Sequence, residues 1–259
     1  MDALVIAGGI PEPGEPLFAE TRGQPKALLD IAGKPMVQWV LDALGQAHHV
    51  ERVVLVGLTA DSGVRCSKPT DFQPNFGGLL ANIEGGVRRL LELNPQAEYV
   101  LAVSSDIPAI TGPMIDWTVE TTMQTRHDLY YCVIERDLME KRFPGSRRSF
   151  VRLKDREVCG GDMNVFRTRL VTNRVFWEKI VAARKNAMKQ AALVGVDVFL
   201  LLLARQLSLQ RAERMISRRL KLRGRVVLCP YPEIGMDVDK PHQLEILRRD
   251  LEARVQLPS

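Results

Sequence analysis

Short apolar segments alternate along the chain with longer stretches in which apolar residues recur every three or four positions. The short segments are rich in Val, Ile and Leu without polar alternation, which is typical of strands buried on both faces of a parallel sheet. The strands that this pattern predicts span residues 2–7, 52–57, 99–104, 128–134 and 225–229. Because helical stretches separate these strands, we expect a three-layer α/β/α fold with a mostly parallel, Rossmann-like central sheet.

Helical periodicity is clearest between the strands and again in the second half of the chain. The helices that it predicts span residues 35–47, 77–93, 111–126 and 135–142, with a final helix ending near residue 254. Residues 173–219 have a helical pattern almost throughout and predict three helices, the last capped by Ser208. We therefore expect a single domain over residues 1–259, with a helical insert at about 167–225.

Other segments lack a helical pattern. Residues 10–21 contain Pro11, Pro13 and Pro16, and we expect no helix there because proline lacks the backbone N–H that a helix needs. Residues 59–76 are expected to be irregular. Glycine-containing turns and a basic loop precede two further short strands, expected at 150–154 and within 159–166.

The composition is that of an ordinary globular protein, since 46% of the 259 residues are hydrophobic and 26% are charged. No segment reaches the run of about 18 apolar residues that a membrane span needs, and the N-terminus lacks the pattern of a signal peptide. The cysteines lie far apart, which argues against a disulfide framework and a structural zinc site: Cys66, Cys132, Cys159 and Cys229. We therefore expect a cytoplasmic protein.

Two basic segments account for most of the formal net charge of +5. Residues 141–156 carry seven basic side chains and one acidic, and residues 205–225 carry eight and one. Such segments attract nucleic acid, anionic lipid or a phosphorylated substrate, but they are equally typical of solvated helix faces. Nucleic acid is disfavoured because residues 205–225 offer no aromatic side chain for base stacking. The apolar residues 198–203 leave contact with a membrane surface open, although a core helix or a homo-oligomer interface is favoured.

Candidate chemistry begins at Gly8 and Gly9, directly after the first predicted strand. Glycines there let backbone N–H groups approach a phosphate or a base closely, although such a pair is equally typical of a tight turn. The spacing is not that of a dinucleotide-binding fingerprint, and Lys26 lacks the following Ser or Thr of a P-loop. Lys26 follows Pro25 and is either a positive charge for a phosphate or an exposed loop lysine.

Acidic residues follow other predicted strands. Asp106 ends an apolar segment, and Asp237 and Asp239 precede the final helix. Each carboxylate can cap a turn, and Asp239 can be the N-cap of that helix. Alternatively they bind Mg²⁺, which prefers one or two carboxylates together with substrate phosphates. Because the carboxyl ends of parallel strands meet at one edge of a sheet, we expect these residues and the glycines to face one cleft.

Four motifs lie at these predicted strand ends. They are Leu4-Val-Ile-Ala-Gly-Gly9, Pro25-Lys-Ala-Leu-Leu-Asp-Ile-Ala-Gly-Lys-Pro-Met36, Ser104-Ser-Asp-Ile-Pro108 and Asp237-Val-Asp-Lys-Pro-His-Gln-Leu244. Together they resemble the MobA-like and sugar-phosphate nucleotidyltransferases, which have a GT-A-like fold. The resemblance covers about residues 1–166, resumes at 226–247 and leaves 167–225 unmatched.

The resemblance implies a role for each motif. The backbone of Ala7, Gly8 and Gly9 would hold the base and ribose of an NTP. Lys26 would contact the phosphates, and Asp106 and Asp239 would hold Mg²⁺, which makes Lys26 and Asp106 the implied catalytic residues. Further implied contacts are Gly77, Gly78 and Asn82 to the base, and Gly161, Asp162 and Asn164 to the second substrate.

The loop after the glycines departs from the family. Members usually place an arginine there that grips the triphosphate, whereas this chain has Pro11, Glu12 and Pro13 in a loop that is several residues longer. The glutamates of this loop would repel phosphate. Arg22 is the candidate to substitute for the missing arginine, and the sequence leaves open whether it does so.

The combined pattern predicts a Mg²⁺-dependent nucleotidyltransferase. It would transfer an NMP from an NTP to a phosphorylated sugar, alcohol or cofactor and release pyrophosphate. One alternative is a GT-A-type glycosyltransferase, which also binds a metal at a strand-end acidic motif; the Pro-Lys-x-Leu-Leu context of Lys26 favours nucleotidyl transfer. The other alternative is a non-catalytic protein that binds an anionic surface through its basic segments.

Overall fold

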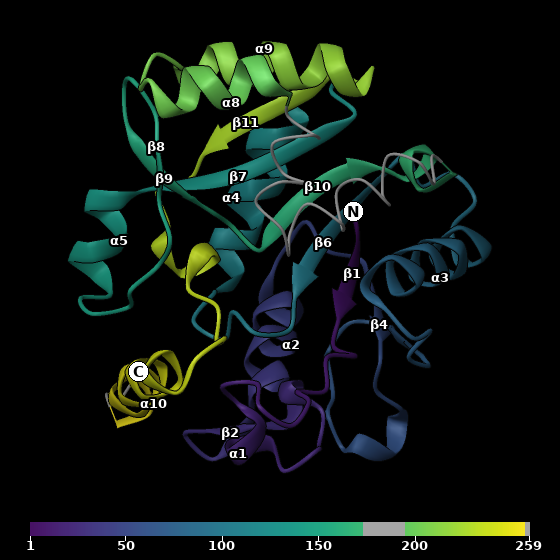
Figure 1. Ribbon diagram of the computed structural model, residues 1–259. Coiled ribbons are helices and arrows are strands. Elements are labelled where there is room, and N and C mark those ends of the chain that lie inside the picture. Colours follow the sequence, from purple (N-terminus) through teal and green to yellow (C-terminus); the bar gives the residue numbers. More distant parts are fainter. Residues whose placement is uncertain (173–194, 257–259) are drawn as a thin grey trace.

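A nine-stranded mixed sheet lies at the centre of the structure (Figure 1). The computed structural model describes residues 1–172 and 195–256. Within them the strand order is β5-β4-β1-β6-β10-β7-β9-β8, and β11 pairs with β7. The strands of this sheet are β1 (Asp2–Ile6), β4 (Arg52–Val56), β5 (Thr70–Gln73), β6 (Tyr99–Ser104), β7 (Leu129–Glu135), β8 (Val151–Arg152), β9 (Glu157–Gly160), β10 (Met163–Arg167) and β11 (Gly224–Leu228). A separate two-stranded sheet joins β2 (Asp30–Ile31) to β3 (Lys34–Pro35).

Strand β1 is the centre of the parallel part of this sheet. It pairs in parallel with β4 and β6, so that Ile6 lies beside Val56 on one side and Ser104 on the other. Strand β10 runs antiparallel to both β6 and β7, and β11 is parallel to β7. The carboxyl ends of β1, β6 and β7 therefore lie at the same edge of the sheet. The predicted fold class is confirmed, although β8, β9 and β10 bring antiparallel pairing into the sheet.

Helices cover both faces of the sheet (Figure 1). They are α1 (Phe18–Thr21), α2 (Met36–Gln46), α3 (Leu79–Leu93), α4 (Gly112–Met123), α5 (Arg136–Arg142), α8 (Val196–Leu203), α9 (Leu209–Leu220) and α10 (Pro241–Gln256). Alternate residues of β1 face opposite layers: Leu4 packs in one cluster with α3, whereas Ala3 and Val5 pack in another with α2 and α4. Helix α3 approaches the sheet closely because Gly86 has no side chain; a Cβ there would lie 2.3 Å from a methyl group of Leu4.

Two expectations about the loops are wrong. Helix α1 forms within residues 10–21. It spans Phe18–Thr21 and follows the last proline, Pro16, so no proline interrupts its backbone hydrogen bonds. Strand β5 forms within the segment expected to be irregular. It is an edge strand of four residues, Thr-Asp-Phe-Gln. Its mainly polar sequence does not indicate a strand, and it is one because it pairs with β4.

Helices α8 and α9 lie together beyond β11, at the top of Figure 1. The predicted cap is confirmed, since Oγ of Ser208 accepts a hydrogen bond from Arg211 N at 3.4 Å. Val198 is buried in a small cluster with α9, whereas Leu200 and Leu203 are 58% and 64% exposed. The first part of the expected helical insert, residues 173–194, lies outside the described residues. Within the described chain, every helix is too short or too polar to cross a membrane.

Candidate functional site

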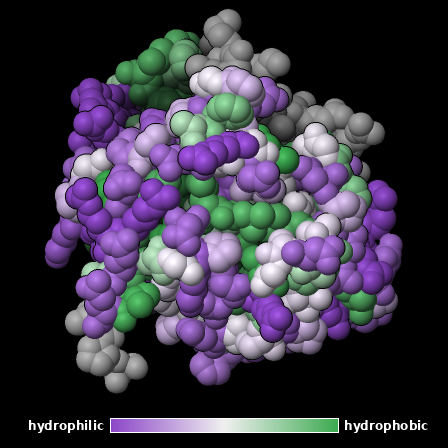
Figure 2. Space-filling model, turned by 90° about the horizontal axis from the view of Figure 1, so that it is seen from below, coloured by the Kyte–Doolittle hydropathy of each residue, from purple (hydrophilic) through white to green (hydrophobic). Residues whose placement is uncertain are grey.

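The carboxyl edge of the sheet brings the predicted site residues together. The backbone N–H of Ala7 donates to Val56 O at 2.8 Å, which extends the pairing of β1 and β4 to the start of the glycine turn. Ser105 N donates to Ile6 O at 3.2 Å, and Val238 N donates to Asp106 O at 3.0 Å. Figure 2 views the molecule from the side toward which β1 and β6 point in Figure 1, and apolar residues occupy the middle of this face between hydrophilic ones.

Lys26 lies between two of the predicted carboxylates. Its backbone N–H donates to Gly9 O at 2.9 Å, which fixes the start of a short 3-10 helix, Lys26–Leu28, against the glycine turn. Its Nζ lies 2.5 Å from Oδ2 of Asp106 and 3.0 Å from Oδ1 of Asp239. The lysine side chain is only 17% exposed, so the alternative of an exposed loop lysine is wrong.

Lys26, Asp106 and Asp239 form a lysine triad, and its electrostatics keep the lysine charged. Burial by itself lowers the pKa of Lys26, but the charges and hydrogen bonds of Asp106 and Asp239 outweigh it and raise that pKa well above its ordinary value. Asp106 is held from the other side, because its Oδ1 accepts a hydrogen bond from Ser104 Oγ at 2.5 Å. The backbone N–H of Asp239 donates to Gln243 Oε1 at 3.0 Å, so the first turn of α10 orients the loop.

Asp106 and Asp239 have the donor chemistry for a hard cation. Both carboxylates direct an oxygen at the same ammonium nitrogen, so a cation at that point would have an oxygen of each as a neighbour. Among the described residues there is no group of three or more His, Cys, Asp or Glu side chains with metal-binding geometry. An all-protein metal cage is therefore not formed by these residues. Two carboxylates fit Mg²⁺, which usually takes one or two together with water and substrate phosphates.

The glycine turn is packed against a neighbouring loop. A Cβ at Gly8 would lie 2.9 Å from Asn82 Nδ2 and 3.0 Å from Asn75, whereas a Cβ at Gly9 would meet nothing within 4 Å. Asn75 Nδ2 donates to Gly8 O at 2.8 Å. Gly57, with φ +103°, also leaves space for this turn, since a Cβ there would lie 2.2 Å from Gly8 Cα. No sequence pattern indicates Asn75, which belongs to a segment without periodicity.

The predicted base-binding segment lies beside this turn. Gly77 has φ +91° and donates its N–H to Asn75 Oδ1 at 3.0 Å, and Gly78 precedes α3. Asn82 is 3% exposed, and its Oδ1 accepts a hydrogen bond from Phe76 N at 2.7 Å. Asn82 thus shapes the loop that faces Gly8, and the exposed backbone of Gly77 and Gly78 is the accessible part of the segment.

Arg22 is not brought to the triad. It is exposed at the end of α1 with φ 50°, and its side chain forms no ion pair with any described residue, Asp106 and Asp239 included. Its own loop is ordered by other contacts, such as Glu12 N to Glu15 Oε2 at 3.0 Å. The expectation that Arg22 replaces the missing arginine thus stays a prediction for the nucleotide-bound protein.

The predicted acceptor segment begins β10 at the same edge. Gly161 N donates to Cys132 O at 2.8 Å, and Asp162 N donates to Ile234 O at 2.8 Å. The side chain of Asn164 is engaged in the sheet: its Oδ1 accepts from Cys132 N at 2.9 Å and its Nδ2 donates to Gly161 O at 3.0 Å. Asn164 thus positions the turn, whereas Asp162 is directed toward a basic residue.

That basic residue, Arg148, was not singled out from the sequence, although the basic segment 141–156 contains it. Its guanidinium forms an ion pair with Asp237 and lies 3.7 Å from Asp162 Oδ2. It also donates to Gly160 O at 3.5 Å. The Arg148 side chain is 14% exposed, so it joins the loop that carries Asp239 to the segment that carries Asp162.

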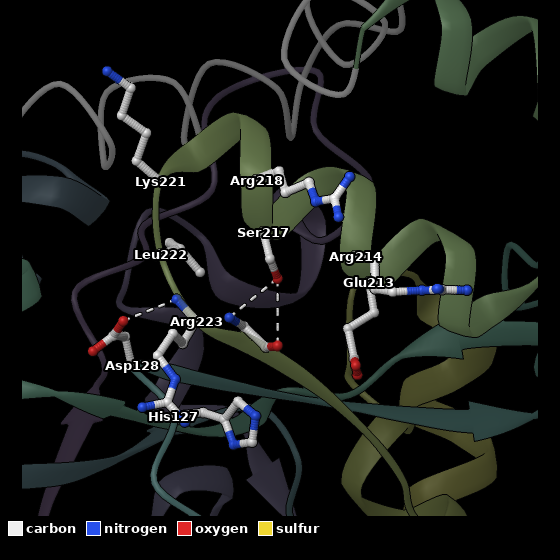
Figure 3. Close-up of a pocket in the computed structure, with 10 residues that line it drawn as sticks. His127, Asp128, Glu213, Arg214, Ser217, Arg218, Lys221, Leu222 and Arg223 are labelled. Carbon is white, nitrogen blue, oxygen red and sulfur yellow. Dashed lines mark hydrogen bonds between the residues drawn. The ribbon is translucent and has the colours of Figure 1, made fainter.

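A cavity of about 490 Å³ lies at the opposite edge of the sheet (Figure 3). It is lined by α9 and by the segments that lead into β7 and β11, with His127, Ser217 and Arg223 among its residues. Ser217 points inward and contacts Gly224, while Arg214 and Lys221 are directed outward. None of the predicted site residues lines this cavity.

Comparison with known proteins identifies the family. The model of the MobA-like NTP transferase domain matches residues 3–222. A solved structure of a hypothetical transferase from Thermus thermophilus has 33% sequence identity and a TM-score of 0.80, over 94% of this chain and 98% of that one. A CMP:2-keto-3-deoxy-manno-octonic acid synthetase complexed with CTP has a TM-score of 0.58 at 15% identity, over 98% and 99% of the two chains, and shares the fold.

Two curated relatives match part of the chain. A 3-deoxy-manno-octulosonate cytidylyltransferase from Geobacter sulfurreducens is 38% identical over 105 residues, 38% of this chain and 39% of that protein. A 2-C-methyl-D-erythritol 4-phosphate cytidylyltransferase from Lachnospira eligens is 29% identical over 129 residues, 48% of this chain and 53% of that protein. The chain thus spans about half, or less, of the length of these relatives.

Proposed function

The chain belongs to the MobA-like NTP transferase family, and from this premise we propose that it transfers a nucleoside monophosphate from an NTP to a phosphorylated small molecule and releases pyrophosphate. The observation that carries the proposal is the contact of Lys26 Nζ with both Asp106 and Asp239. A lysine and two carboxylates from three distant segments are the groups that this chemistry needs. We also propose that residues 1–259 act as one nucleotidyltransferase domain, with 167–225 as its helical insert.

In the proposed reaction, the protein mainly positions the reactants and stabilises charge. Lys26 turns from its carboxylates to the phosphates of the nucleotide and stabilises the transition state and the leaving group. Asp106 and Asp239 would hold Mg²⁺, which would neutralise charge on the α-phosphate. The backbone of Ala7, Gly8 and Gly9 holds the base and ribose.

The proposed reaction needs no side chain of the protein to act as a general base. An oxygen of the acceptor's phosphate forms a bond to the α-phosphorus, and the bond from that phosphorus to the bridging oxygen breaks. Pyrophosphate leaves with the electron pair. The attacking phosphate is already ionised near pH 7, because the second pKa of a phosphomonoester is about 6. A histidine at the triad is therefore not needed.

We propose CTP as the donor. Both curated relatives are named cytidylyltransferases, and the synthetase of the same fold was solved with CTP. The accessible backbone of Gly77 and Gly78 beside the glycine turn supports a base site at that place, because backbone N–H and C=O groups distinguish bases by their hydrogen-bonding edges.

The test is a screen for pyrophosphate release. The protein is incubated with each of the four NTPs, Mg²⁺ and a panel of sugar and alcohol phosphates, with a chelator as the control. We expect release with CTP and an acceptor phosphate, and none after chelation. In a parallel thermal-shift assay, a nucleotide at 100 times its Kd should add about 2.7 kcal/mol of stability. Binding of UDP-sugars with Mg²⁺, but of no NTP, would instead support the glycosyltransferase.

A further inference from the structure

A second cavity, of about 600 Å³, opens at the same edge of the sheet as the lysine triad. It lies where β7 ends, between α5, the loop that follows it, and the β8–β9 hairpin. Its lining residues are Arg136, Glu140, Pro144, Gly145, Ser146, Arg147, Arg148, Phe150, Arg152 and Glu157. Most of these lining residues belong to the basic segment 141–156, which contributes no residue to the lysine triad.

One arginine that lines this cavity, Arg147, has no acidic partner among the described residues. Four arginines line it against two glutamates. Glu157 pairs with both Arg136, at 2.7 Å, and Arg152, at 3.2 Å. Arg136 also pairs with Glu140 at 2.9 Å, and Arg148 pairs with Asp237. Arg147 is exposed, and among the described residues its guanidinium has no acidic partner. Nε of Arg148 is buried without a hydrogen-bond partner among the same residues. An anionic group in the cavity would therefore meet the exposed guanidinium of Arg147, which has no acidic partner among the described residues.

Two contacts connect the cavity to the lysine triad. Arg148, which forms its wall, is paired with Asp237, two residues before Asp239. Ser146 O accepts a hydrogen bond from Gln243 Nε2 at 3.5 Å, and Oε1 of the same glutamine accepts the N–H of Asp239 at 3.0 Å. The loop that carries the proposed metal ligand thus borders the cavity directly.

We propose that this cavity is the acceptor site, in which Arg147 and Arg152 bind the phosphate of the acceptor; this rests on the nucleotidyl transfer proposed above. The planar guanidinium fork binds phosphate oxygens in pairs, which leaves another oxygen of the same group free for attack. Both arginines have accessible side chains, Arg152 being 56% exposed, so binding needs no disruption of the core.

The cavity of Figure 3 provides a matched comparison. It is also basic, with Arg214, Arg218, Lys221 and Arg223 among its lining residues. It lies at the amino ends of β7 and β11, however, and none of its residues contacts the lysine triad. Removal of two arginines there changes the charge equally without touching the proposed acceptor site.

The experiment measures the binding of glycerol 3-phosphate by calorimetry. The protein is saturated with Mg²⁺ and α,β-methylene CTP, a non-reactive nucleotide analogue that keeps the probe out of the nucleotide site. The variants are R147A/R152A and, as the control, R214A/R218A. Loss of charge-assisted hydrogen bonds worth about 1.5–3 kcal/mol corresponds to an increase in Kd of about 10- to 150-fold, which we expect for R147A/R152A only.

Several outcomes overturn the proposal. They are no binding of glycerol 3-phosphate by the wild-type protein, an unchanged Kd in R147A/R152A, or an equal loss in R214A/R218A. Glycerate, a carboxylate of similar size, serves as a separate ligand, and binding as tight as that of glycerol 3-phosphate overturns the choice of phosphate. Binding of the CTP analogue is measured separately in each variant. If the wild-type protein did not bind the analogue, the proposed nucleotidyltransferase activity itself would be contradicted. If R147A/R152A still binds the analogue, the two substitutions affect the acceptor site and not the nucleotide site.

Discussion

The ammonium group of Lys26 lies 2.5 Å from the carboxylate of Asp106, although 80 positions separate the two residues in the chain. The same nitrogen contacts Asp239 at 3.0 Å. The lysine therefore neutralises the carboxylates that are proposed to hold Mg²⁺. In the proposed reaction, the lysine would contact the phosphates of the nucleotide, and the two carboxylates would hold the cation.

We expect Asp106→Asn to reduce turnover by about 100- to 1,000-fold, because it removes a charge that would hold the cation at the reacting phosphate. Asparagine retains an oxygen that can accept the hydrogen bond of Ser104 Oγ, so the local fold should persist. The measurement is pyrophosphate release with saturating CTP and Mg²⁺. Asp42→Asn is the control, since Asp42 pairs with Lys34 away from the triad. Full turnover in Asp106→Asn would contradict the metal assignment.

Lys26→Met tests the pairing through its pH dependence. The folded-state pKa of Lys26 is raised above the unfolded value of about 10.4, so the pairing contributes its full stability below that pH and loses it as the pH rises further. We expect Lys26→Met to lower the free energy of unfolding by about 3 kcal/mol between pH 7 and 9, and by less above about pH 10.4.

Urea unfolding at several pH values measures this difference. The control is Lys34→Met, which removes a more exposed pair at 2.7 Å from Asp42 and should cost no more than about 1 kcal/mol. A difference between wild type and Lys26→Met that increases from pH 9 to 11 would show that the pairing does not stabilise the folded state in this way.

Gly8→Ala and Gly9→Ala should separate folding from binding. A Cβ at Gly8 would press on Asn75 and Asn82, and we expect a loss of about 1–3 kcal/mol in the free energy of unfolding. A Cβ at Gly9 meets open space, so stability should change by less than about 0.5 kcal/mol. If the nucleotide lies over this turn, Gly9→Ala should nevertheless weaken CTP binding by about tenfold, as one lost hydrogen bond would. Unchanged CTP binding in Gly9→Ala would place the nucleotide elsewhere.

The sequence predicted the site best where strand geometry alone decides it. Gly8, Gly9 and Asp106 follow β1 and β6, and parallel pairing in register places such residues at one edge. Lys26 and Asp239 come from loops, so their contact depends on packing that periodicity cannot show. The strand positions were therefore predictable, and the 3.0 Å contact between these two side chains was not.

The features that were missed depend on tertiary contacts. Asn75 acts through the carbonyl of Gly8, and Arg148 through carboxylates on two other segments. Neither residue belongs to a motif, and a basic segment alone does not tell which of its arginines is buried. Strand β5 was missed for the same reason, because its pairing with β4, rather than its own polar sequence, makes it a strand.

The buried thiols give a prediction about the interior of the sheet. Burial raises the pKa of Cys229 to about 12, and it also raises the pKa values of Cys132 and Cys159. At pH 8 only about one Cys229 side chain in ten thousand is then a thiolate, the form that reacts with alkylating agents. We expect iodoacetamide to leave these three cysteines unmodified in the native protein and to label all four in urea. Cys66, which is only partly buried, should react slowly before unfolding. Mass spectrometry of peptides after a timed reaction measures each site, and rapid native labelling of Cys229 would contradict the burial of the segment that directly follows β11.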